Sequence, residues 1–223
     1  MPPDSWVCVQ CGKSVPRLWE AIGTIDKRVV ACQHCGGVAD KYVEFDPVFL
    51  ALDVLLHRPQ VYRHLLLNVL PRHSPAARHL VRSLVAVVCF NAFSTWTRLG
   101  RPTDAPLTLL AAQAAGDWAV FVGVLALGCK VASPGLSMGF ISLSAIACSW
   151  SRIATVLAMV WDSAGGELLI PVSVEALSCS SAFMVVQTIL YPRSDQVQVA
   201  PIAVVVVAAL ARVAFWQLPI GTG

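Results

Sequence analysis

The chain has 223 residues, of which 57% are hydrophobic and only 13% are charged, and its mean hydropathy is +0.68. Soluble domains carry about 25% charged residues, so this chain has too little polar surface to cover a water-soluble globule of its size. The net charge of +3 is small. The basic residues gather directly before a hydrophobic stretch, which favours a membrane surface over nucleic acid as their partner.

Four of the eight cysteines lie in the polar segment 1–46 as two Cys-x-x-Cys pairs, and a glycine follows each pair. The paired residues are Cys8, Cys11, Cys32 and Cys35. Two such turns complete a tetrahedral shell of four thiolates, which suits zinc. A closed shell leaves no position for water, so we expect a structural zinc that stabilises a segment with little core of its own.

Other interpretations of these cysteines are two disulfides or one redox-active pair. The first residues lack the basic region and apolar run of a secretory signal. The N-terminus is therefore expected in the reducing cytosol, which argues against disulfides. His34 is an alternative ligand, and a RING finger would need eight ligands where one set of four is visible. Short apolar runs at 29–31 and 42–45 predict weak strands around the site.

Two short helices are expected after the cysteine module. Asp46 and Pro47 predict a helix start, and this helix would run over 48–57 and end before Pro59. A second helix over 60–70 would end before the next proline. One face of this second helix is apolar, and it is made by Tyr62, Leu65, Leu66 and Val69.

The second part of the segment 47–79 is also basic. Residues 57–82 contain five arginines and four histidines but no acidic residue. A basic amphipathic helix can lie in the headgroup region of a bilayer. The alternative is an ordinary helix packed on its own domain. The residues expected to contact lipid or a partner are Asp53, His57, Arg58, Tyr62, Arg63, His64, Leu65, Leu66 and Asn68.

Residues 80–223 form a predicted transmembrane region. Its five hydrophobic segments lie at about 81–97, 112–130, 136–161, 168–190 and 199–218. The fold class expected is therefore an all-α membrane protein with about five spans and a small zinc-ribbon-like β module. With the N-terminus in the cytosol, the cluster from Arg58 to Arg82 also falls in the cytosol, as the positive-inside rule requires. Arg98 and Arg101 disagree with this orientation.

Two charged residues lie deep in the hydrophobic segments. Arg152 and Glu175 could pair between the third and fourth segments, because a charge inside a bilayer usually faces the bundle interior. Such a pair is either an internal staple that fixes helix packing or part of a polar path for lipid headgroups. Alternatively, Arg152 marks a third segment that consists of two short helices or a re-entrant piece.

A family resemblance is carried by the two cysteine knuckles, by residues 40–47 (DKYVEFDP) and by residues 53–68 (DVLLHRPQVYRHLLLN). Over residues 6–70 the chain resembles the N-terminal homology domain of the Arv family, first named as acyltransferase-related and required for viability. The resemblance implies an endoplasmic reticulum protein of sterol and sphingolipid homeostasis, with a link to glycosylphosphatidylinositol anchor synthesis.

Three classes of function can be weighed at this point. The first is a factor that mediates or regulates intracellular lipid or sterol transport, with sterol, sphingolipid or anchor precursors as its lipids. The second is a non-catalytic scaffold or regulator of the endoplasmic reticulum complex that starts anchor synthesis. An enzyme is not expected, because the sequence has no nucleophile elbow, phosphate loop or pair of carboxylates with a base.

Overall fold

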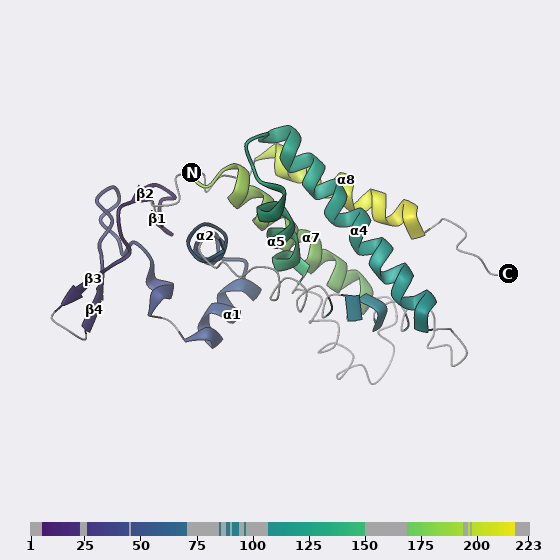
Figure 1. The fold of residues 1–223 in the computed structure, drawn as a ribbon, viewed down its shortest axis with the longest axis horizontal. Helices are drawn as coiled ribbons and strands as arrows, with labels where there is room; N and C mark the ends of the chain where they lie inside the picture. The colour runs from purple at the N-terminus through teal and green to yellow at the C-terminus, as the bar shows by residue number, and fades with distance from the viewer. Residues whose placement is uncertain are drawn as a thin grey trace. The chain divides into compact units, whose positions relative to one another are not determined.

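The computed structural model describes residues 6–22, 26–44, 46–70, 107–149, 169–193 and 198–216, together with positions 85, 88, 89, 91–93, 96 and 196 (Figure 1). The chain divides into two compact units. The first unit contains residues 1–74 and 184–198, and the second contains residues 75–183 and 199–223. The cysteine module and the two short helices that follow it therefore belong to one unit.

The cysteine module is built from two short antiparallel hairpins. β1 (Trp6–Val7) pairs with β2 (Ser14–Val15), and β3 (Trp19–Ile22) pairs with β4 (Asp26–Val29). The run predicted as a strand at 29–31 supplies the end of β4 and a single bridge to residue 38. Two of the four cysteines lie in the small core of this module, which consists of Cys8, Val15, Leu18, Cys32 and Ala39.

The strand predicted at 42–45 is wrong for its described part. Lys41–Val43 form a 3-10 turn, η1, and Asp40 caps it by accepting a hydrogen bond from the Tyr42 amide at 3.0 Å. Because an aspartate that binds the amide two residues on bends the chain, the apolar run turns and buries Tyr42 instead of extending.

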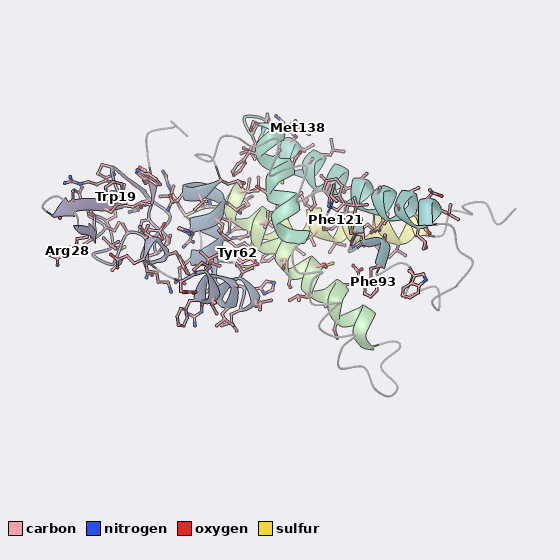
Figure 2. The ribbon with its side chains drawn as sticks, turned by 60° about the horizontal axis from the view of Figure 1, so that its bottom comes forward. Trp19, Arg28, Tyr62, Phe93, Phe121 and Met138 are labelled. Atoms are coloured by element: carbon pink, nitrogen blue, oxygen red, sulfur yellow. The ribbon has the colours of Figure 1, made fainter. Side chains whose placement is uncertain are left out.

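The two predicted helices are present. α1 spans Pro47–Leu55 and is capped by Asp46, whose carboxylate accepts from the Val48 amide at 2.8 Å. α2 spans Pro59–Arg63 and continues without a break as a π-helical segment, η2, over His64–Val69. Tyr62 packs against α1, and its hydroxyl donates to the Val54 carbonyl at 3.4 Å (Figure 2).

The second unit is helical in its described part. Its helices are α4 (Leu107–Ala132), α5 (Met138–Ser149), α7 (Leu169–Leu190, whose last residues belong to the first unit) and α8 (Val199–Trp216). α4 and α8 run side by side (Figure 1).

One described helix is long and apolar enough to cross a membrane, and it covers Thr108–Ala132. Two shorter apolar stretches cover Glu175–Leu190 and Val199–Ala214. Most of the predicted segment 81–97 and the second half of 136–161 lie outside the described residues. The count of five spans therefore stays a prediction.

Candidate metal centre

The four predicted cysteine ligands converge on one point. Their sulfur atoms all lie within 4.8 Å of one another, and the Cys8–Cys35 and Cys11–Cys32 sulfurs are each 3.8 Å apart. Zn–S bonds of about 2.3 Å in a tetrahedron place the sulfurs about 3.8 Å apart. The donor set and its geometry therefore fit zinc, whereas a disulfide would need an S–S distance of about 2.05 Å.

The two knuckles repeat the same hydrogen bonds. The Gly12 amide donates to the Cys8 carbonyl and the Gly36 amide to the Cys32 carbonyl, both at 2.9 Å. Both glycines have positive φ, 68° and 73°, a region that side chains with a Cβ disfavour. The glycine after each cysteine pair is thus required by the turn that brings two sulfurs together.

The environment of the thiols differs between the knuckles. Burial raises the pKa of Cys8 to about 12. Burial also acts on Cys32, but hydrogen bonds from the His34 and Cys35 amides outweigh it and lower the pKa of Cys32 to about 7. His34 therefore contributes its backbone amide, 3.4 Å from the Cys32 sulfur, and its ring is outside the four-sulfur cluster. A bound cation would stabilise the thiolate form of all four ligands.

Arg63 of α2 holds the backbone of the first knuckle through two hydrogen bonds. One guanidinium nitrogen of Arg63 donates to the carbonyls of Val9 and Gln10, at 3.0 and 2.9 Å. These are the two residues between Cys8 and Cys11. Hydrogen bonds from a charged donor are the stronger kind, so Arg63 fixes the turn that presents the two thiols.

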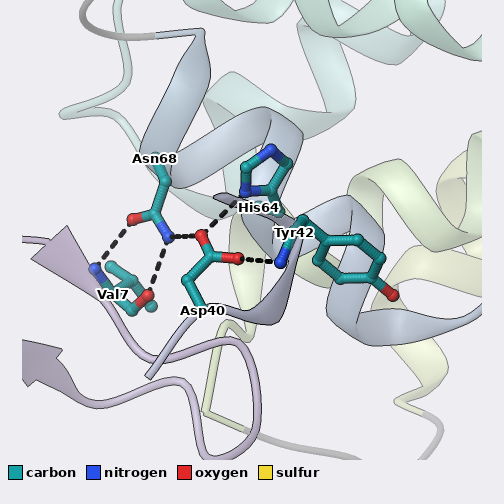
Figure 3. Close-up of polar contacts among 5 residues, drawn as sticks. All are labelled: Val7, Asp40, Tyr42, His64 and Asn68. Atoms are coloured by element: carbon teal, nitrogen blue, oxygen red, sulfur yellow. Dashed lines mark hydrogen bonds and ion pairs between the residues drawn. The ribbon is translucent and has the colours of Figure 1, made fainter. Parts of the chain in front are cut away.

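A second contact ties η2 to the strand before the knuckle (Figure 3). The Asn68 side chain accepts from the Val7 amide at 2.8 Å and donates to the Val7 carbonyl at 2.9 Å, as a neighbouring strand would. Its amide group also donates to Asp40, at 2.8 Å, and the same carboxylate oxygen pairs with His64 Nδ1 at 2.7 Å. Asp40 is fully buried, and its carboxylate oxygens find their partners inside the unit, in Asn68, His64 and the Tyr42 amide.

The π-helical winding explains how these side chains meet. Arg63 and Asn68 are five residues apart, and an i→i+5 helix brings such positions onto the same side. The Leu70 amide bonds to the Leu65 carbonyl at 2.8 Å, which is the π-helical pattern. An ordinary α-helix would turn the two side chains well apart.

Asp53 is the centre of a separate polar cluster. The Tyr42 hydroxyl donates to it at 2.7 Å, and Lys41 and Arg58 form ion pairs with it at 3.5 and 3.2 Å. The hydrogen bond from Tyr42 and the two cations hold the pKa of Asp53 below its usual value. Burial and the neighbouring carboxylate raise the pKa of Tyr42. This cluster fastens α1 to η1.

The structure changes the interpretation of the nine predicted contact residues. Six of them are buried inside the first unit: Asp53, Tyr62, Arg63, His64, Leu66 and Asn68. Leu65 and His57 are half-buried, and Arg58 is exposed. The six buried residues hold the unit together and do not present a surface to lipid, because hydrogen bonds and packing use them internally. Asp40 was not among the predicted site residues, although it lies between the second cysteine pair and Tyr42 in the sequence.

An ion cluster lies between three helices of the second unit. Arg212 of α8 binds Asp117 of α4 through two nitrogens, at 2.8 and 2.7 Å, and Glu175 of α7 at 2.8 Å. Arg212 and Asp117 are buried. Glu175 was predicted to pair with Arg152, which lies outside the described residues.

Comparison with known proteins places this arrangement in a family. Residues 7–210 match the model of the Arv1-like family. The chain belongs to the Arv1-like family. It is 42% identical over 94 residues to Protein arv1 of Schizosaccharomyces pombe and 26% identical over 182 residues to the Protein arv1 homolog of Dictyostelium discoideum. It is 24% identical over 111 residues to Protein ARV1 of Mus musculus.

These Arv1-like relatives are matched over different shares of their length. The matched part covers 41% of this chain and 35% of the S. pombe protein, against 70% and 74% for the Dictyostelium protein. For the mouse protein the shares are 50% and 40%. The match therefore spans about a third of the first relative. No solved structure matches the chain.

Proposed function

We propose that this Arv1-like chain is a multi-pass protein of the endoplasmic reticulum membrane that mediates or regulates intracellular transport of sterol and other lipids. In this proposal it acts without catalysis and supports sterol and sphingolipid homeostasis. The four cysteines hold a structural zinc on the cytosolic side.

The observation that carries the proposal is that one chain of this family contains both a four-thiolate module and a set of apolar helices. A four-thiolate module is locked to a helix pair by Arg63 and Asn68. The chain continues into apolar helices, of which α4 is long enough to cross a bilayer. A rigid module joined to such helices fits a protein that acts on or within the membrane.

The ion cluster of Arg212, Asp117 and Glu175 adds to this support. Charges inside a membrane are costly and usually face a bundle interior or a cavity. A polar path for lipid headgroups and an internal staple that fixes helix packing both predict such a cluster, so it supports helices that lie within a membrane under either interpretation.

The second candidate function is a scaffold or regulator of a membrane enzyme complex, such as the one that starts anchor synthesis. The burial of Arg63, His64 and Asn68 favours this alternative. Since internal contacts use these side chains, they are not available to read lipid headgroups.

Purification from native membranes in mild detergent tests the two functions. Transport predicts a chain that carries bound sterol or another lipid, identified by mass spectrometry, and cells that redistribute sterol when the chain is depleted. Stoichiometric enzyme subunits without bound lipid would instead support the scaffold. A Cys8→Ser/Cys11→Ser variant should fail in both assays, and Cys89→Ser serves as the matched control outside the cluster.

Topology is tested separately. Glycosylation acceptors inserted before residue 40 should stay unmodified in microsomes if the zinc module is cytosolic. Efficient modification there would reverse the orientation.

A further inference from the structure

α1 presents an apolar stripe to the outside of the first unit. The stripe consists of Val48, Phe49, Leu52, Leu55 and Leu56, whose exposed fractions run from 47% to 65%. These positions are spaced i, i+1, i+4, i+7 and i+8, so they share one side of the helix. Soluble surfaces rarely gather five large apolar side chains in this way.

The opposite side of the helix accounts for its attachment to the unit. Asp53 is the one charged residue of α1, and it points inward to Tyr42 and Lys41. Leu50 and Val54 are half-buried on that side. The stripe therefore lies on the side of the helix away from Asp53, and no charge interrupts it.

We infer that this stripe is seated in the surface of a lipid bilayer, with α1 lying in the plane of the membrane. The inference rests on the proposed function in so far as that places the chain in a membrane. It assigns the lipid contact to the first helix of the pair, because Tyr62 and Leu66 of the second are buried.

Charge and tethering select a bilayer as the occupant. Arg58 follows the stripe directly. Its Nε pairs with Asp53, and half of the side chain is exposed, where an anionic headgroup can meet the rest of the guanidinium. The same chain contains the membrane-length helix Thr108–Ala132, which would tether the unit to a bilayer. A helix with a short apolar face and a basic residue at its edge fits the boundary between headgroups and acyl chains.

The experiment uses the full chain reconstituted in vesicles of phosphatidylcholine and phosphatidylserine that contain an alkyne-tagged phosphatidylcholine. A photoreactive benzoylphenylalanine replaces Leu52 in one sample. In the matched control it replaces Arg28, an exposed residue of the β3–β4 hairpin (Figure 2). Zinc content is measured in both samples to verify that the unit is folded.

The inference predicts lipid adducts at position 52 in several-fold higher yield than at position 28. Replacing Leu56 should give the same result as replacing Leu52. Adducts of position 52 with a second chain, with a helix of its own chain, or in yields equal to position 28 would each overturn it. If position 52 forms lipid adducts but the purified chain carries no sterol or other bound lipid, the inference about the stripe holds and only the transport function is contradicted.

Discussion

Arg63 donates a hydrogen bond to the carbonyl of Val9, 3.0 Å away and 54 positions earlier in the chain. Replacing Arg63 with Met keeps much of the apolar stem and removes this bond and the one to Gln10. Hydrogen bonds to charged groups contribute about 1.5–3 kcal/mol each. We expect faster transfer of zinc to a competing chelator and a lower melting temperature. Arg17→Met removes an exposed arginine of the same module and should change neither.

The metal prediction concerns stoichiometry and stability. Purified chain should contain one zinc, and removal by a chelator should unfold the cysteine module, because two of the ligands form part of its small core. Elemental analysis and hydrogen exchange of residues 6–44 check this. Chain that is free of metal yet keeps the exchange protection of the loaded form would contradict a structural role.

The Asp53 cluster yields a prediction on pH. The pKa of Asp53 is lower in the folded unit than in the unfolded chain. The stability that it contributes is thus fully present above the unfolded value of about 3.9 and is lost as pH falls through the folded value. Asp53→Asn should therefore destabilise the unit by the same amount at pH 6 and pH 8. Thermal unfolding at both values measures this, and a difference that grows toward pH 8 would point to another group.

Replacement by glutamate should unfold the first unit at Leu66 but not at Leu52. Leu66 is almost fully buried, so Leu66→Glu places an unpaired charge in the interior and should abolish folding of the first unit. Leu52→Glu lies on the exposed stripe and should leave zinc content unchanged while it weakens lipid contact. Zinc content and melting temperature separate the two variants, and a stable Leu66→Glu protein would show that the packing described for η2 is wrong.

Arg212→Leu should destabilise the second unit strongly. It leaves Asp117 and Glu175 without their cation, and breaking a buried ion pair costs about 3–5 kcal/mol. Adding Asp117→Asn and Glu175→Gln to the same chain should recover much of the loss. Melting temperatures in detergent compare these proteins, with Lys130→Leu, which removes a half-buried cation of α4 outside the cluster, as the control. Failure of the triple variant to recover would mean that the cluster does more than balance charge.

The local structure around the cysteines could be predicted from the sequence. Ligand spacing, the glycine after each pair and the capping residue Asp46 act over a few positions, so they identify the zinc turns and the start of α1 directly. The apolar segments that form α4, α7 and α8 could likewise be predicted, because length and hydropathy are properties of the sequence alone.

Tertiary structure decided which faces are internal. Periodicity identified an apolar face on the second helix, but it could not show that Tyr62 and Leu66 of this face are buried while the first helix keeps its own stripe exposed. Arg63 and Asn68 are polar residues that the sequence assigned to a contact surface, and Asp40 was not among the predicted site residues. Arg63 and Asn68 are buried because a π-helical turn aligns them with the backbone around the first knuckle, and Asp40 is buried between His64 and Asn68. Hydrogen bonds between residues far apart in the sequence offset the cost of removing these groups from water.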